Sequence, residues 1–329
     1  MKIIRSNYKT PYLNFALEEL LLKSDELSSE DILLIYQNEN AIIVGRNQNT
    51  HEEINDVFVK DNKISIARRL SGGGAVYQDE GNVNFCFITH DKESSYTKFL
   101  EPIIGFLNSL GLHAVFTGKN DVTIDDIKIS GNAQYKYKHR MFHHGTLLFN
   151  SDLFVLGSAL KPNKLKLQSK SIKSARQRVS NIRDLMNPKI NTENFIQKLI
   201  SYFQAKNYEL INQDIITEED INQLAELKSS PNWNFSKNPD FEFKNTKRFS
   251  GGTITLKIST NNNKISHIKI EGDFLSTNDF EDIYKFFIGK TFDLKTIKKI
   301  FTDINNFSDY FGKITANELL TLFNKGQDV

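Results

Sequence analysis

The sequence contains a single cysteine, Cys86, and only six prolines among its 329 residues. One cysteine cannot form a disulfide within the chain, so nothing indicates an oxidising compartment. A long hydrophobic run is also missing, and the N-terminal stretch MKIIRSNYKTPYLNFALEEL carries polar residues throughout. This pattern is typical of neither a signal peptide nor a membrane span. We therefore expect a cytoplasmic protein that does not bind membranes.

Excess charge of either sign is missing as well. The 42 lysines and arginines almost balance the 40 aspartates and glutamates, which leaves a formal net charge of +2. Proteins that bind nucleic acid typically show a strongly basic composition, so nucleic acid is not an expected partner. With 39% hydrophobic residues the chain can bury sizeable cores, and its length indicates two domains.

Strand-like runs in groups, with helices between some of them, fill most of the chain. Thr10 is a candidate N-cap and Pro11 a candidate first-turn residue for a helix that ends near Lys23. The runs ILLIYQN and AIIVGR, separated by Glu39 and Asn40, predict a β-hairpin. Further helices are predicted over 98–110, 193–206 and 217–229. Because helices and strands do not alternate strictly, the pattern favours an α+β fold with a mixed or antiparallel sheet.

The stretch SSPNWNFSKNPDFEF, residues 229–243, is rich in Pro, Asn and aromatic residues and is typical of a domain boundary. Beyond it, two strand-like runs flank the polar turn NNNK and predict a second hairpin, which three short helices follow. We therefore expect a large domain over residues 1–245 and a small α+β accessory domain over residues 246–329.

Three consecutive glycines follow two arginines in RRLSGGGAVYQDEGN, residues 68–82. Glycines permit positive φ and let backbone amides approach an anion closely. The spacing fits neither a Walker loop nor a dinucleotide-binding fingerprint, and a tight hairpin would explain the glycines alone. Arg68 and Arg69 end the incoming strand and should point to opposite faces. One of them can therefore face the loop and pair with a phosphate or carboxylate.

A second polar stretch, GKNDVTIDDIKISGNAQY, spans residues 118–135. Asn120 and Asp121 are predicted to occupy a turn. Lys128 lies between two isoleucines in a strand, so its side chain should point away from the apolar face. Simple exposure to solvent and a functional role are both open for this lysine.

A third stretch, FHHGTLLFN, contains two adjacent histidines, His143 and His144. On a strand they point to opposite faces and cannot easily share one metal ion. No spacing typical of zinc ligands is present, so the metal ligands of this protein stay unassigned.

Residues 161–183, KPNKLKLQSKSIKSARQRVSNIR, are dominated by lysine and arginine and contain no aromatic residue. The composition is typical of a solvated basic loop. The alternative is a loop that folds over an anionic ligand, with Arg176 and Arg178 as the expected contacts.

Taken together, these stretches resemble the lipoate–protein ligases. RRLSGGGAVYQDEGN, GKND, KISGNA and HHGTLL occur in that family's order, and NFALEE, GRNQN, ARQRVSN and SPNWNF extend the resemblance over nearly the whole chain. The family often has histidine after the tyrosine of the glycine loop, where this chain has Gln78, but no catalytic role follows from that position. The resemblance implies a catalytic domain like that of the biotin ligases, with a central mixed sheet packed by helices.

The resemblance also implies the chemistry. Such ligases join lipoate to ATP with Mg²⁺, release pyrophosphate, hold lipoyl-AMP and transfer the lipoyl group to one lysine of an acceptor domain. Lys128 is implied as the catalytic cation, and Asp121 as a candidate Mg²⁺ ligand. Tyr36 and Val44 are expected to form walls of an apolar slot for lipoate. The implied ligand-binding residues are Arg69, Ser71, Gly72, Gly73, Gly74, Ala75, Val76, Tyr77, Asn120, Asp121, His144 and Gly145.

The implied partners are the acyltransferase subunits of 2-oxoacid dehydrogenases, the glycine-cleavage H protein, or both, and a monomer is expected. Three alternatives remain open. An octanoyl or lipoyl transferase of the same fold would use a cysteine nucleophile, but Cys86 lies upstream of the region where such enzymes carry it. A biotin–protein ligase would lack HHGTLL followed by a long basic loop. An inactive module that binds lipoyl domains would have no need of Lys128, Arg69 and an intact SGGG.

Overall fold

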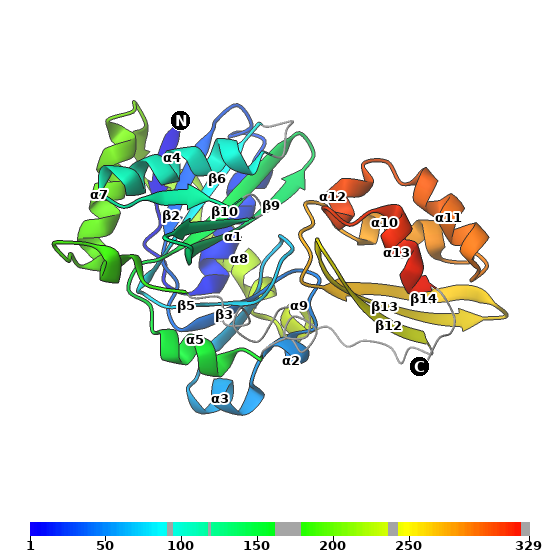
Figure 1. Ribbon diagram of the computed structural model, residues 1–329. Coiled ribbons are helices and arrows are strands. Elements are labelled where there is room, and N and C mark those ends of the chain that lie inside the picture. Colours follow the sequence, from blue (N-terminus) through cyan, green and yellow to red (C-terminus); the bar gives the residue numbers. More distant parts are fainter. Residues whose placement is uncertain (91–94, 118–119, 162–178, 236–242, 324–329) are drawn as a thin grey trace.

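The computed structural model describes residues 1–90, 95–117, 120–161, 179–235 and 243–323. Figure 1 shows a larger N-terminal domain and a smaller C-terminal domain beside it. Within the described residues, none of the helices combines the length and the apolar composition that crossing a bilayer requires.

A mixed sheet of eight strands forms the centre of the larger domain, in the order β11-β1-β2-β6-β10-β9-β8-β7. Strand β1 pairs in parallel with β11 and β2, whereas the pairs from β2 to β7 are antiparallel. The strands are β1 (Lys2–Arg5), β2 (Ile32–Tyr36), β6 (Asn82–Thr89), β7 (Ala114–Phe116), β8 (Asp121–Ile124), β9 (Ile127–Tyr137), β10 (Arg140–Leu148) and β11 (Glu209–Ile211).

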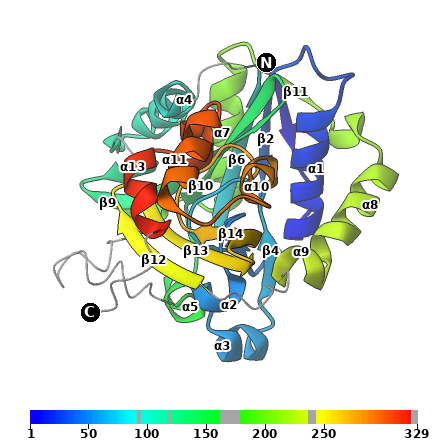
Figure 2. The ribbon, with the colours of Figure 1, turned by 90° about the vertical axis from the view of Figure 1, so that its right-hand side faces the viewer.

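Helices cover both faces of this sheet, which confirms the α+β prediction (Figure 2). Helices α4 (Tyr96–Ser109) and α7 (Thr192–Gln204) pack their phenylalanines and leucines on one face. Helices α1 (Pro11–Lys23) and α8 (Glu218–Ser229) cover the other. The side chain of Thr10 accepts a hydrogen bond from the amide of Leu13, so this residue caps α1 as predicted.

A second sheet of three strands, in the order β4-β3-β5, lies below the large sheet in Figure 1. It comprises β3 (Ala41–Val44), β4 (Ser65–Arg68) and β5 (Val76–Gln78), and it packs near α2 (Thr50–Glu53), α3 (Asp56–Asp61), α5 (Leu153–Ala159) and α9 (Pro231–Phe235). The hairpin predicted from ILLIYQN and AIIVGR is wrong, because β2 and β3 belong to different sheets. Between them the side chain of Asn38 is fully buried and bonds to Asn14 and Gln78, so the chain passes from one sheet to the other.

The smaller domain contains the antiparallel sheet β12 (Phe243–Phe249), β13 (Gly252–Asn261) and β14 (Lys264–Gly272). The predicted hairpin is β13–β14. Among the described residues four short α-helices follow instead of the expected three: α10 (Glu281–Phe287), α11 (Leu294–Asp303), α12 (Phe307–Phe311) and α13 (Ala316–Leu320). They lie against one face of the sheet and bury a core of phenylalanines and isoleucines. The exact boundary between residues 245 and 246 stays a prediction.

Candidate functional site

The glycine loop connects β4 to β5, which flank β3 on its two sides, so the loop crosses the end of β3. The guanidinium of Arg69 holds it in shape by donating to the carbonyl oxygens of Gly72 (2.7 Å) and Gly74 (2.8 Å). Gly73 has a φ of 93°, a conformation that favours glycine. A Cβ on Gly45 would lie 2.0 Å from the carbonyl oxygen of Gly73, so the loop and the GRNQN turn are in direct contact.

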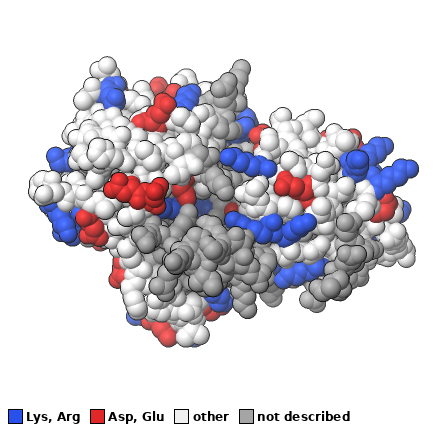
Figure 3. Space-filling view, viewed as in Figure 1, with Lys and Arg blue, Asp and Glu red and all other residues white. Residues whose placement is uncertain are grey.

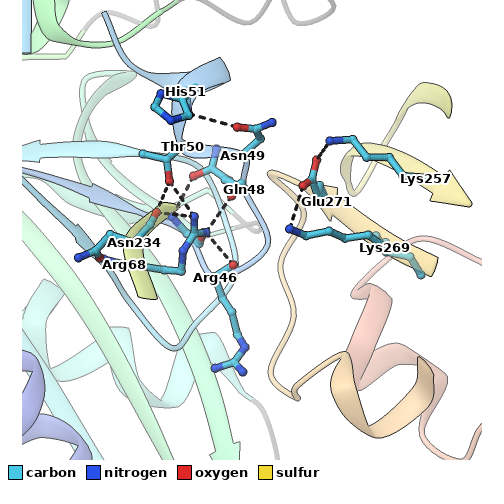
Figure 4. Close-up of polar contacts among 12 residues, drawn as sticks. Arg46, Gln48, Asn49, Thr50, His51, Arg68, Asn234, Lys257, Lys269 and Glu271 are labelled. Atoms are coloured by element: carbon cyan, nitrogen blue, oxygen red, sulfur yellow. Dashed lines mark hydrogen bonds and ion pairs between the residues drawn. The ribbon is translucent and has the colours of Figure 1, made fainter. Parts of the chain in front are cut away.

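Arg68 points the other way, which confirms the prediction that the two arginines separate. Its guanidinium is buried and lies among residues of the GRNQN turn, residues 45–49, whose carbonyl oxygens it binds (Figure 4). Burial lowers the pKa of Arg68 to about 10. The side chain donates to oxygen atoms of Gly45, Arg46, Gln48, Thr50, Trp233 and Asn234. The stretch SPNWNF, which the sequence indicated as a boundary, therefore contributes α9 to the support of this turn.

A buried polar array ties the glycine loop to the large sheet. The hydroxyl of Ser71 lies 2.6 Å from Nε2 of His144 on β10, and Nδ1 of the same ring lies 3.1 Å from the carboxylate of Glu18 on α1. The hydroxyl of Tyr36 donates to that carboxylate at 3.3 Å. A carboxylate can only accept, so Nδ1 of His144 is the donor in its contact with Glu18. The array fixes the position of the loop relative to three separate elements.

Glu18 was not among the predicted site residues. The sequence did hold a signal for it, because Asn14 and Glu18 are four residues apart in a helix with an apolar stripe and so lie on one face. Both are buried in the structure. A buried carboxylate requires hydrogen-bond partners, and here they are supplied by the ring and the hydroxyl described above.

Lys128 lies in β9 at a β-bulge, where the register with β8 shifts between Val122 and Thr123. Its ammonium is 2.7 Å from the carboxylate of Asp121 and half-buried, with 26% of the side chain exposed. A Cβ on Gly131, which pairs with Asp121, would lie 3.4 Å from the Lys128 nitrogen. Because Gly131 has no side chain, the ammonium has room there. The bulge shifts the alternation of β9, so that Lys128 and Gly131 lie on the same face of the strand.

The ammonium of Lys128 and the glycine loop are on the same side of the large sheet. Ala133 pairs with His144, whose ring contacts Ser71, and Gly131 is two residues away on the same face of β9. Two residues of a strand span about 7 Å. The structure therefore places the pair Lys128–Asp121 on the same face of the sheet as the pair Ser71–His144.

Asn120 and Gly145 have roles within the sheet. The side-chain amide of Asn120 donates to the carbonyl oxygen of Asn132 at 3.1 Å, and the Asn132 amide donates in return to the Asn120 carbonyl at 3.0 Å. A Cβ on Gly145 would lie 2.0 Å from Oδ1 of Asn132. Glycine is thus required at position 145 to admit this side chain, whose buried Oδ1 has no hydrogen-bond partner among the residues that the structure describes.

Residues of β5 point in different directions. Tyr77 belongs to the core of the small sheet, and its hydroxyl donates to Asn40 at 3.0 Å. Val76 packs beside the core that contains Tyr36, whereas Val44 belongs to the same core as Tyr77. The two predicted walls of a lipoate slot, Tyr36 and Val44, are therefore in different cores.

His143 points to the opposite face from His144, as predicted. It stacks with Phe99 and contacts Gln134 through Nδ1 at 3.1 Å. Burial, with a smaller contribution from His144, lowers the pKa of His143 to about 3, so the ring is neutral. In the part of the chain that the structure describes, no three acidic, histidine or cysteine side chains cluster closely enough to hold a metal ion.

The accessory domain lies directly on the glycine loop. The amides of Gly72 and Gly73 donate to the carbonyl oxygens of Ser276 (3.3 Å) and Phe274 (2.8 Å). The side chain of Asn47 in the GRNQN turn bonds to the Ser276 hydroxyl at 2.9 Å. Neither Phe274 nor Ser276 was predicted, because the sequence contains no pattern that pairs the two domains.

Cys86 is fully buried in β6, and burial together with the nearby Glu18 raises the pKa of its thiol well above the usual value. Most of the basic stretch 161–183, with Arg176 and Arg178, lies outside the described residues. Its end is described: Val179 bridges to Lys128, and the amide of Ser180 donates to the Lys128 carbonyl at 3.3 Å. The C-terminal end of the basic stretch therefore lies directly beside Lys128.

Two family profiles match the chain. The one described as the lipoyl protein ligase A/B catalytic domain matches residues 10–204, and the one described as the bacterial lipoate protein ligase C-terminus matches residues 238–323. Lipoate–protein ligase 1 of Staphylococcus aureus strain Mu50 is 40% identical over 331 residues, covering 98% of this chain and 99% of that protein. Lipoate-protein ligase LplJ of Bacillus subtilis strain 168 is also 40% identical, over 97% and 98%.

Solved structures agree with the profiles. LipL1 of P. falciparum, in complex with lipoate, superposes with a TM-score of 0.83 at 28% identity, over 97% of this chain and 98% of that one. The bipartite lipoate protein ligase of Thermoplasma acidophilum, solved with its E2 lipoyl domain, gives 0.60 at 27% identity, over 74% and 98%. A lipoate-protein ligase A bound with ATP gives 0.59 at 25% identity, over 72% and 99%. Fold, site and profiles together define an enzyme that ligates an acyl group to protein. The chain belongs to the lipoate–protein ligase family.

Proposed function

We propose that this enzyme activates lipoate with ATP to form lipoyl-AMP, releases pyrophosphate, and transfers the lipoyl group to a lysine of a lipoyl-acceptor domain. The observation that carries the proposal is the placement of Lys128. Its ammonium is 2.7 Å from the carboxylate of Asp121 and lies where a side chain at Gly131 would otherwise contact it. It faces the same side of the sheet as the glycine loop. Relatives solved with lipoate and with ATP support both substrates.

In the first step the lipoate carboxylate must approach the α-phosphate, and both groups are anions. A fixed cation between them lowers this barrier because it stabilises charge that develops in the transition state. Lys128 supplies that cation, and Asp121 keeps the flexible side chain in place. The same ammonium then stabilises negative charge on the carbonyl oxygen of the anhydride when the acceptor amine attacks it.

The glycine loop binds phosphate oxygens through its amides, with Arg69 as the residue that shapes it. The Arg69 guanidinium donates to oxygen atoms of the loop (Ser71, Gly72 and Gly74) and of Ile43 in β3, so we assign it a positioning role within the predicted set. A phosphate that takes the amides of Gly72 and Gly73 must replace the carbonyl oxygens of Phe274 and Ser276. The segment that carries these carbonyls therefore moves when nucleotide binds.

Mg²⁺ fits this site with the nucleotide as its main ligand. Asp121 is already paired with Lys128 at 2.7 Å, so the phosphates of the nucleotide would supply the ligands of Mg²⁺, which commonly binds through few carboxylates plus substrate phosphates. When bound, Mg²⁺ would neutralise negative charge on the phosphates.

The acceptor is a lipoyl domain, in agreement with the relative that was solved with its E2 lipoyl domain. The acyltransferase subunits of 2-oxoacid dehydrogenases and the glycine-cleavage H protein both carry such a lysine. A transferase with a cysteine nucleophile is disfavoured, because Cys86 is buried and its raised pKa keeps it a thiol. A monomer in the cytoplasm stays our prediction.

Lipoate-dependent exchange between ATP and labelled pyrophosphate tests the proposal. Exchange requires reversible formation of an acyl-adenylate, so the enzyme should show it with lipoate and lose it without lipoate. Exchange with biotin instead would make the enzyme a biotin ligase. Acyl transfer from a carrier protein without ATP would make it a transferase.

A further inference from the structure

Three lysines form a row across the accessory sheet. The strand registers place Lys244 of β12 opposite Lys257 of β13, and Lys257 opposite Lys269 of β14. Directly paired residues of antiparallel strands point to the same face, and like charges in such pairs are destabilising. We call Lys244, Lys257 and Lys269 the lysine row. Lys257, at its centre, is only 6% exposed.

One carboxylate serves two lysines of the row. Glu271 lies 2.7 Å from the nitrogen of Lys257 and 3.4 Å from that of Lys269. Glu271 belongs to the adjacent row on this face, where it pairs with Thr255, and the hydroxyls of Thr255 and Thr246 are 2.9 Å apart. The two lysines share this one carboxylate, so the three side chains together keep an excess of one positive charge.

Lys257, Lys269 and Glu271 lie on the side of the accessory sheet that is turned toward the GRNQN turn of the catalytic domain (Figure 4). The amide of Gly272, one residue after Glu271, donates to the Asn47 carbonyl at 2.6 Å and joins the sheet to the turn. Charges on the two domains influence each other here. Burial lowers the pKa of Lys269, and the positive charges of Lys257 and Arg68 lower it further, against the opposing effect of Glu271. In Figure 3, blue side chains extend over the accessory domain toward the junction.

The turn is also the neighbour of the glycine loop, through the close approach of Gly45 to Gly73. The strand that carries Lys269 is thus joined, through the GRNQN turn, to the loop that binds the nucleotide in the proposed function. Neighbouring strands lie about 4.8 Å apart, so two ammonium groups on adjacent strands can reach both phosphoryl groups of one diphosphate.

We propose that Lys257 and Lys269 bind a diphosphate group, either as the β- and γ-phosphates of ATP or as the pyrophosphate that leaves. This inference rests on the proposed function for its ligand, and it gives the accessory domain a direct part in the adenylation step. The transfer step involves no pyrophosphate, so the lysine row does not act there.

Kinetics of the full-length enzyme with Lys257→Gln and Lys269→Gln variants provide the first test. Each variant should raise the KM for ATP and for pyrophosphate in the lipoate-dependent exchange by about tenfold, the effect of one lost charged contact. Transfer from presynthesised lipoyl-AMP to an acceptor domain should stay unchanged. Lys264→Gln, an exposed lysine at the start of β14, is the matched control and should change neither step.

Glu271→Gln distinguishes a binding site from a structural ion triad. If the row binds diphosphate, removing its carboxylate strengthens the attraction, so the KM for pyrophosphate should fall by several-fold while both lysine variants raise it. If the triad only holds the strands, all three variants should lower the melting temperature and impair both steps alike. That common direction, or an unchanged KM in the lysine variants, would overturn the proposal.

Calorimetric titration of pyrophosphate into the wild type and into Lys257→Gln, without lipoate or ATP, separates this inference from the proposed function. Weaker binding in the variant supports the site even if the wild type shows no exchange. Equal binding in both proteins refutes it whatever the enzyme's activity.

Discussion

Replacement of Lys128 by methionine removes one positive charge and keeps most of the volume of the side chain. The ammonium is 2.7 Å from Asp121 and only 26% of the lysine side chain is exposed, so water replaces it poorly. At an effective dielectric constant of about 20, one charge about 4 Å from a developing negative charge contributes about 4 kcal/mol. Loss of one such transition-state contact typically costs about a hundredfold to a thousandfold in rate. We expect lipoyl-AMP formation to fall by that factor.

The assay is single-turnover formation of lipoyl-AMP from lipoate and ATP, together with a thermal unfolding curve. Lys60→Met, on the exposed side of α3, is the control for a lost surface lysine and should react like the wild type. The Lys128→Met protein should remain folded, because the core under β9 is built by Ile129 and its neighbours on the other face.

A second variant separates charge from shape. Lys128→Met leaves the Asp121 carboxylate without its cation, where it repels both substrates. Adding Asp121→Asn to Lys128→Met should therefore recover part of the lost rate. Formation of lipoyl-AMP at the wild-type rate in folded Lys128→Met would refute the role of this lysine. Failure of the double variant to recover any rate would refute the electrostatic account of the loss.

Three further predictions concern buried groups. Cys86→Ser should leave ligation unchanged and cost at most about 1–3 kcal/mol of unfolding free energy for a buried hydroxyl; a thioester trapped at Cys86 in the wild type would contradict it. Glu18→Gln should lower the unfolding free energy by about 2 kcal/mol, because the charged acceptor of His144 is lost, and should raise the KM for ATP, because the array positions the glycine loop; denaturant unfolding that matches the wild type would show the array to be dispensable. His143 has a lowered pKa of about 3, whereas an unfolded histidine titrates near 6.5, so the unfolded state binds the extra proton between these values. The unfolding free energy should therefore fall as pH drops from 6.5 toward 3, by up to about 1.4 kcal/mol per pH unit. His143→Asn should remove this part of the pH dependence in acid unfolding, because the Asn Oδ1 can accept from Gln134 as Nδ1 does. An unchanged pH dependence in the variant would mean that another group causes it.

Local features of the fold could be predicted well from the sequence. Thr10 and Pro11 marked the start of α1 because capping and the fixed φ of proline act within one turn. The opposite orientations of Arg68 and Arg69 followed from the alternation of a strand. In each case the signal and its cause are only a few residues apart.

The predictions failed where distant segments decide the outcome. β2 and β3 are both wholly buried, so their apolar patterns cannot reveal that they belong to different sheets. Phe274 and Ser276 contribute to the site through backbone carbonyls, which leave no trace in side-chain identity. Glu18 becomes meaningful only when β10 places His144 beside it.

The burial of Cys86 has a practical consequence for measuring motion. With its raised pKa and no exposed surface, the native thiol should react slowly with maleimide and other thiol reagents. The protein is therefore ready for site-specific labelling without removal of any natural residue. A cysteine introduced at exposed Lys60 and another at exposed Lys264 would carry a donor and an acceptor dye on the two domains. Energy transfer between the dyes would then report the distance between the domains at each step of the reaction.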